Sequence, residues 1–176
     1  MSRRAVPFRP ALTLLTCALL ALPVAAAAQD DEPHGLSLDL FGGASAIYSS
    51  SSGLSLHTES VGARGGFSLT RVWTVEAALS RTSGDPVTWN GEVSAKAYLF
   101  QNERVRLFAL AGPGIRHEDF SGGSTDSATV HAAIGVEVAL SPKFYLRPEL
   151  RSRWPTAHFD AGHRSEDLTL GFGWRF

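Results

Sequence analysis

The last ten residues of the chain read Asp167-Leu168-Thr169-Leu170-Gly171-Phe172-Gly173-Trp174-Arg175-Phe176. Successive side chains of an extended strand point to opposite faces, so one face would carry Leu168, Leu170, Phe172, Trp174 and Phe176. The other face would be small or polar, and its glycines would leave room for bulky neighbours such as Tyr145 and Arg147. No later segment could cover the apolar row. We therefore expect that row to meet an environment outside the chain, and a lipid bilayer would supply it.

The same period of two recurs upstream in seven further segments. They predict strands at about residues 36–48, 56–69, 73–80, 93–100, 105–116, 129–140 and 144–153. Long connections follow every odd-numbered strand and short turns follow every even-numbered one, an asymmetry that is typical of transmembrane barrels. The sequence thus predicts an all-β fold, an eight-stranded antiparallel up-and-down transmembrane β-barrel. An even number of strands would leave both termini in the periplasm.

A soluble β-sandwich is the main alternative, because its strands also alternate. One face of each strand would then pack in a dry core, where unpaired charge is strongly destabilising. The faces opposite the apolar rows carry nine charged residues: Asp39, Arg64, Glu76, Lys96, Arg106, Glu137, Arg147, Glu149 and Arg151. An eight-stranded barrel has interior space only for side chains. We therefore expect a salt-bridged polar plug in the lumen, and an ion path is the alternative.

The N-terminal residues 1–28 have the features of a secretory signal peptide. Three arginines precede an apolar segment at 11–22, and Ala26-Ala27-Ala28 forms a small-residue cleavage site. Residues 29–35 would then be a periplasmic lead-in, and 36–176 the barrel domain. Cleavage would remove Cys17, the only cysteine, so no disulfide is expected. It would leave 13 basic and 17 acidic residues, and a net charge of −4 suggests no nucleic-acid partner.

The terminal strand resembles the C-terminal signal of bacterial outer-membrane β-barrels, in which a polar residue, a glycine, an aromatic residue and a final Phe recur. Here the matching positions are Thr169, Gly171, Trp174 and Phe176. With its strand number and loop asymmetry, the mature chain resembles the small OmpA/OmpX-type outer-membrane β-barrel family. The resemblance implies a monomer without cofactors in the outer membrane of a Gram-negative cell, inserted by the barrel assembly machinery. It also implies a non-enzymatic role of the extracellular loops in adhesion, defence or envelope integrity.

Histidines and acids gather at the predicted loop end. They are His57, His117, His158, His163, Glu59, Glu118, Asp119, Asp126, Asp160, Glu166 and Asp167. Their spacing lacks the regularity of a preformed metal site, so we expect no metal. The pair His163 and Ser165 resembles the His-x-Ser of outer-membrane lipid A deacylases, although Glu166 stands where that family has asparagine. A lipid A-modifying enzyme is therefore an alternative function.

Arginines are the expected link to outer-membrane lipids. Four of them are predicted near the outer leaflet: Arg116, Arg151, Arg153 and Arg164. Guanidinium groups pair well with phosphates, so lipopolysaccharide is an expected partner.

Overall fold

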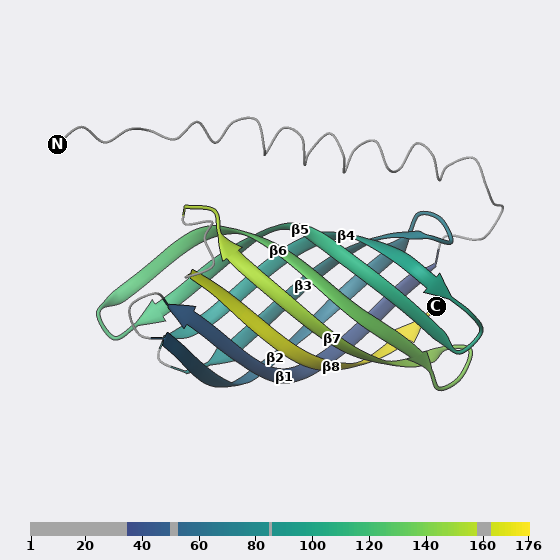
Figure 1. The fold of residues 1–176 in the computed structure, drawn as a ribbon, viewed down its shortest axis with the longest axis horizontal. Helices are drawn as coiled ribbons and strands as arrows, with labels where there is room; N and C mark the ends of the chain where they lie inside the picture. The colour runs from purple at the N-terminus through teal and green to yellow at the C-terminus, as the bar shows by residue number, and fades with distance from the viewer. Residues whose placement is uncertain (1–34, 50–52, 85, 158–162) are drawn as a thin grey trace. The chain divides into compact units, whose positions relative to one another are not determined.

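The computed structural model describes residues 35–49, 53–84, 86–157 and 163–176 (Figure 1). The predicted signal peptide and residues 29–34 of the lead-in lie outside this part of the chain. The described residues form eight strands, all within the unit His34–Phe176. The strands are β1 (Leu36–Ser49), β2 (Gly53–Ser68), β3 (Trp73–Ser83), β4 (Val87–Gln101), β5 (Val105–Phe120), β6 (Gly123–Ala139), β7 (Phe144–Pro155) and β8 (His163–Arg175).

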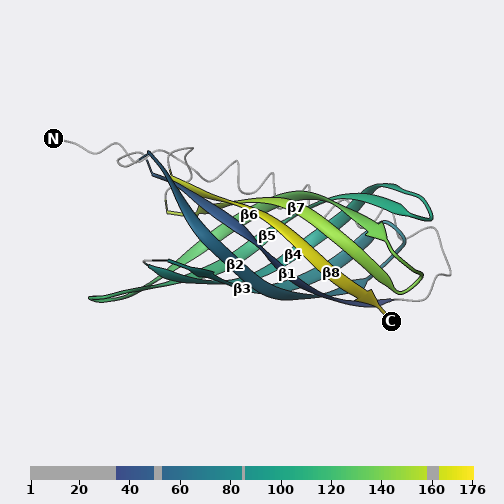
Figure 2. The same cartoon turned by 90° about the horizontal axis from the view of Figure 1, so that it is seen from below.

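Each strand pairs antiparallel with the next along the chain, and β8 pairs with β1 to close the barrel (Figure 2). The closing seam begins at Ser37 opposite Arg175 and continues to Ser49 opposite His163. Beyond it, the Phe176 amide donates to the Leu36 carbonyl at 2.9 Å. A closed sheet has no unpaired edge, so the backbone groups of every strand find partners within the barrel. The predicted eight-stranded antiparallel barrel is confirmed.

The strands are longer than the sequence pattern predicts at the end opposite the short turns. Strand β4 already begins at Val87, and β5 and β6 stay paired up to Phe120 opposite Gly123. Most of the segments predicted as the second and third loops are therefore paired strand. Backbone pairing does not require alternating apolar residues, so it continues past the point where the pattern ends. The β5–β6 hairpin extends furthest among the described strands at this end (Figure 1).

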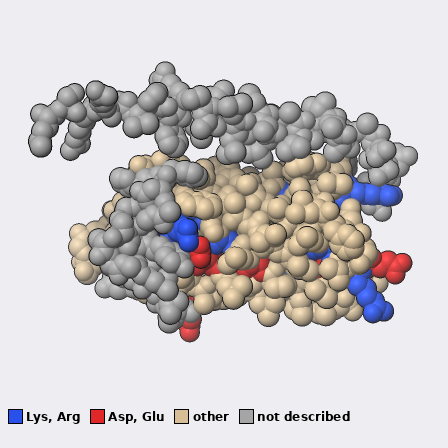
Figure 3. Space-filling view, in the orientation of Figure 1, with Lys and Arg blue, Asp and Glu red and all other residues tan. Residues whose placement is uncertain are grey.

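The outer wall of the barrel is apolar. Leu40, Ile115 and Leu168 are each more than 60% exposed, at 62%, 65% and 63%. Residues other than Lys, Arg, Asp and Glu make up most of the described surface in Figure 3. No described helix has the length and hydropathy that crossing a membrane requires. Large apolar side chains so widely exposed point to an apolar surrounding medium.

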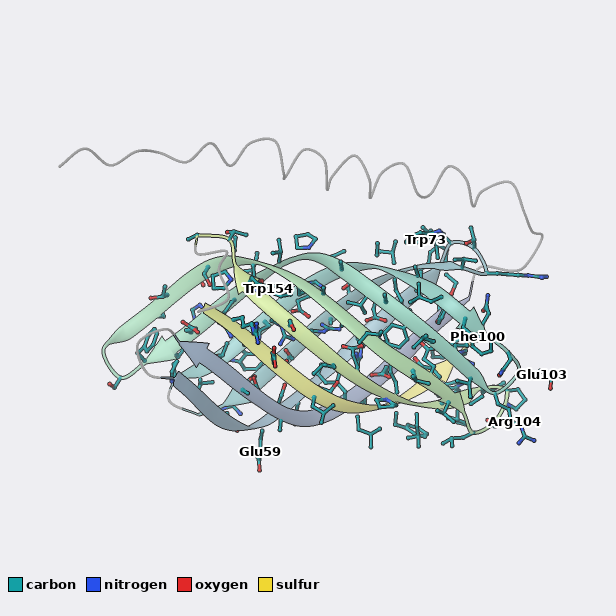
Figure 4. All side chains as sticks on the ribbon, in the orientation of Figure 1. Glu59, Trp73, Phe100, Glu103, Arg104 and Trp154 are labelled. Carbon is teal, nitrogen blue, oxygen red and sulfur yellow. The ribbon has the colours of Figure 1, made fainter. Side chains whose placement is uncertain are left out.

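Aromatic residues lie toward both ends of this wall. Figure 4 shows Trp73 and Phe100 near the short turns and Trp154 near the other end. Close to the turns, the Trp174 ring lies 5.6 Å from that of Phe144 and 4.9 Å from that of Phe176, centroid to centroid. Aromatic bands at both margins of an apolar belt are typical of proteins at membrane–water interfaces.

Two glycines of β8, Gly171 and Gly173, make room for inward side chains of the neighbouring strands β1 and β7. At Gly173 the Tyr145 ring occupies the place that a Cβ atom would take, which confirms the space expected for that ring. At Gly171 a Cβ atom would lie 2.6 Å from the carboxylate oxygens of Asp39, so Asp39 is the nearest side chain there.

Candidate functional site

Within the described chain, the lumen of the barrel holds the largest group of buried charged side chains. Of the nine charged residues predicted to face inward, eight are 2% exposed or less: Asp39, Arg64, Glu76, Lys96, Glu137, Arg147, Glu149 and Arg151. The ninth, Arg106, is half-buried near the short turns, and its guanidinium carbon lies 5.5 Å from the Tyr98 ring centroid. The strand alternation that turns apolar residues outward brings these charges together.

Arg147 on β7 is the centre of the charge network. Its Nη1 and Nη2 donate to the two carboxylate oxygens of Glu76 at 2.6 and 3.0 Å. Its Nη2 also donates to Glu149 Oε2 at 2.6 Å. The guanidinium lies 4.4 Å from the centroid of the Phe108 ring. One planar fork thus binds two carboxylates from opposite sides of the lumen, a geometry that lysine could not reproduce.

Arg64 extends the network to the closing seam. Its Nε donates to Asp39 Oδ1 at 2.8 Å, and its Nη1 donates to Glu149 Oε2 at 2.6 Å. Arg151 binds the other oxygen of Glu149, since its Nε donates to Oε1 at 2.9 Å. Glu149 therefore accepts from three arginines, and the local Arg-Glu-Arg cluster of β7 connects with β1 and β2.

At the short-turn end, Lys96 joins two carboxylates. Its Nζ lies 3.2 Å from Glu76 Oε2 and 3.0 Å from Glu137 Oε1. The Tyr98 hydroxyl donates to Glu137 at 3.1 Å, and Arg175 Nη2 donates to Glu137 Oε2 at 2.7 Å. The terminal strand thus contributes a cation to the lumen as well as an apolar face to the wall.

Four buried inward charges, those of Glu92, Arg116, Arg153 and Asp167, were not in the predicted network. Glu92 accepts from Arg151 and Arg153, and Arg153 also donates to Asp167. The sequence pattern placed Glu92 in a loop and Asp167 among the loop-end acids. Strand parity could have found both, because Glu92 shares the face of Lys96, and Asp167 that of Thr169.

The prediction that Arg116, Arg151 and Arg153 lie near the outer leaflet is wrong. All three point into the lumen, with exposures of 9%, 2% and 2%. They have the same parity as the other inward residues of β5 and β7, so the wall separates them from lipid. Arg164 is different, because it is about one-third exposed and its Nε lies 3.0 Å from Glu166 Oε1.

The buried charges of the described chain balance. Six carboxylates, of Asp39, Glu76, Glu92, Glu137, Glu149 and Asp167, face six cations, of Arg64, Lys96, Arg116, Arg147, Arg151 and Arg153. Charges removed from water need such pairing, because an uncompensated buried charge is costly. The pairing is a property of the whole barrel, since each of the eight strands contributes at least one of these twelve residues.

No hydrolytic arrangement is accessible among the described residues. Ser165 is 1% exposed, and Arg116 Nη2 donates to its hydroxyl at 3.1 Å. Ser94 Oγ lies 2.7 Å from His131 Nε2, but the nearest Glu92 oxygen is 3.8 Å from His131 Nδ1 and is held by arginine. The side chains of His57 and His163, and all of His158 and Asp160, lie outside the described part. Within that part no group of His, Cys, Asp and Glu is arranged to hold a metal.

The predicted assembly signal is split between the two faces of β8. Thr169 and Gly171 face inward and are buried, whereas Trp174 and Phe176 are exposed on the wall at 42% and 67%. Recognition of these residues by the assembly machinery stays a prediction.

A closed antiparallel barrel with an apolar outer wall and a lumen of paired charges defines a transmembrane β-barrel. The chain belongs to the outer membrane protein beta-barrel domain family, whose model matches residues 14–176. It is therefore an outer-membrane β-barrel. Comparison with curated proteins gives no match.

Solved structures share the fold. The N-terminal β-barrel domain of Pseudomonas aeruginosa OprF has a TM-score of 0.65 at 12% identity, covering 81% of this chain and 97% of that one. Neisserial surface protein A gives 0.65 at 18% identity, covering 80% and 97%. Ail, the attachment invasion locus protein of Yersinia pestis, gives 0.62 at 17% identity, covering 82% and 100%.

Proposed function

We propose that the protein is a non-enzymatic surface barrel whose lumen is plugged by its own charges and whose hairpin ends opposite the short turns act outside the cell. The observation that carries the proposal is the balance of six buried carboxylates and six buried cations in the described lumen. Side chains committed to one another in this way serve stability and leave the loop end for interaction. Adhesion, surface defence and envelope integrity are the roles that such an end can perform, and the name of the similar Ail points the same way.

The proposed orientation puts the short turns and the C-terminus in the periplasm and the β5–β6 hairpin outside. Short periplasmic turns and longer extracellular loops are the rule for such barrels. An epitope inserted after Ser121 should bind antibody on intact cells, whereas one inserted after Glu103 should bind only after the outer membrane is permeabilised. The reverse pattern would show the opposite orientation. Equal labelling of the two epitopes would show that the barrel does not lie in the outer membrane.

A narrow pore is the second candidate. Several buried atoms of the network, among them Asp39 Oδ2 and Arg64 Nη2, have no hydrogen-bond partner among the described residues. Water entering the lumen would satisfy them. The plug predicts that the refolded barrel leaves a planar lipid bilayer silent under voltage. Discrete conductance steps that disappear when Arg147 or Glu76 is replaced would instead establish the pore.

Outer-leaflet lipids, including lipopolysaccharide, remain the proposed partners of the wall. Since the lumen holds Arg116, Arg151 and Arg153, the outward cations near the loop end are Arg164 and Arg81 within the described chain. Arg81 is exposed on β3, with its guanidinium carbon 5.8 Å from the Trp89 ring centroid. A cation beside an aromatic ring at the edge of the apolar belt suits a lipid phosphate. The proposed barrel is a monomer.

A further inference from the structure

His117 lies on the outer face of the β5–β6 hairpin, two residues beyond Ile115, the most exposed apolar side chain of β5. It lies directly opposite Asp126 in the strand register. Asp119 follows on the same face of β5. All three side chains are open to solvent, at 40% for His117, 52% for Asp119 and 75% for Asp126. Because these three charged side chains lie beyond Ile115 and are exposed, the group lies outside the apolar belt of the outer wall.

The imidazole contacts both carboxylates at once. Its Nδ1 lies 2.6 Å from Asp126 Oδ1, and its Nε2 lies 3.1 Å from Asp119 Oδ1. An ionised carboxylate only accepts hydrogen bonds, and a neutral imidazole has one N–H donor, whereas an imidazolium has two. The arrangement therefore needs the protonated ring. In the neutral ring one nitrogen would turn its lone pair toward a carboxylate, and that contact would become repulsive.

Apart from Arg81, the neighbouring residues on this face are uncharged, so Asp119 and Asp126 are the acids that act on the His117 ring. On β4, Trp89 is the register partner of His117, and Val87 is that of Asp119. On β6, the neighbour of Asp119 is Ser124. The adjacent Glu118 points to the other face, where its Oε1 lies 3.6 Å from Arg116 Nη1. On β3, Arg81 lies across Trp89 and is the cation of this row.

We propose that His117, Asp119 and Asp126 form a proton-dependent clasp that fixes the outer end of the β5–β6 hairpin and opens when His117 loses its proton. That this end faces the medium rests on the orientation proposed above. Phe120, 45% exposed where the hairpin closes, would then be presented differently in acidic and in alkaline surroundings. The clasp makes the surface that a partner meets dependent on external pH.

The direction of the pH dependence follows from the hydrogen bonds. The bond to Asp126 is the largest influence on the His117 pKa and raises it; desolvation comes next and opposes it, and the bond to Asp119 raises the pKa further, so the net shift is upward. Because the pKa of His117 is raised in the folded hairpin, the protonated ring contributes its full stabilisation at pH values below the ordinary pKa of about 6.5. This contribution is lost as the pH rises through the raised pKa. The clasp is therefore closed in acid and opens toward alkaline pH.

The test is a site-resolved titration of the full barrel refolded in lipid nanodiscs. NMR of the His117 ring nitrogens from about pH 5 to about pH 8 should give a raised midpoint in the natural protein. Asp126→Asn should lower that midpoint, and Asp119→Asn should lower it less. Glu118→Gln is the matched control, since it removes an acid of the same hairpin that faces the other way, and it should leave the midpoint nearly unchanged.

Amide hydrogen exchange supplies the structural readout. After correction for intrinsic rates, protection of residues 117–126 should fall severalfold across the same pH range in the natural protein. In His117→Gln the protection should be low and independent of pH. An ordinary midpoint that neither Asp→Asn change moves would overturn the proposal, as would equal pH dependence in His117→Gln. Because nanodiscs expose both ends of the barrel, these outcomes do not depend on the orientation in the cell.

Discussion

The lumen and the outer wall of this barrel are built from the same strands, yet they hold opposite side chains. On β7 and β8, Arg147 and Asp167 face inward and are at most 1% exposed, whereas Leu168 and Leu170 face outward and are 63% and 56% exposed. A soluble protein has the reverse arrangement. The difference teaches that the cost of a substitution here depends on the face that it alters more than on the residue type introduced.

The largest effect is expected at the centre of the lumen. Arg147→Met would leave Glu76 and Glu149 short of a cation, and removing one partner of a buried pair costs about 3–5 kcal/mol. Urea titration of the barrel in lipid vesicles, followed by tryptophan fluorescence, would measure the loss in free energy of unfolding. Arg106→Met is the matched control at the lumen mouth and should cost much less.

A double variant separates charge compensation from packing. Arg147→Met with Glu76→Gln removes one charge of each sign, so it should be less destabilised than the sum of the two single variants. Strict additivity would show that the two side chains do not depend on each other, and the comparison between lumen and wall would lose its electrostatic basis.

The next largest effect is expected on the wall. Leu170 lies near the middle of β8, and Leu170→Arg would place a charge in hydrocarbon at a cost of about 2–4 kcal/mol. Leu36→Arg, at the short-turn margin, should cost only about 0–1 kcal/mol. The same unfolding measurement checks both. Equal costs at the two depths would mean that Leu170 does not face the membrane interior.

The sequence predicted the fold well because parity alone sorts lipid-facing from lumen-facing residues. It could not predict which charges pair. Glu76 and Arg147 are 71 residues apart in the sequence and meet only because the barrel closes with a particular register. The loop-side charges were misjudged for a different reason. Asn90 and Gly91 have the composition of a turn, which masked the inward Glu92 in a strand that begins earlier.

The histidine clasp shows another limit of sequence reasoning. His117, Asp119 and Asp126 were all recognised as loop-end residues, but a loop gives no reason for them to meet. The pairing of β5 with β6 beyond the apolar belt supplies it, since His117 and Asp126 are register partners. Local composition identified the residues, and strand pairing determined their arrangement.

Gly173 and Tyr145 constrain each other across the seam between β7 and β8. They are register partners, and the ring fills the space where any other residue at position 173 would place its Cβ atom. A larger residue there is compatible with this seam only if residue 145 becomes smaller. The two positions should therefore change together when the sequence diverges, and a library randomised at both should recover them as a matched pair of sizes.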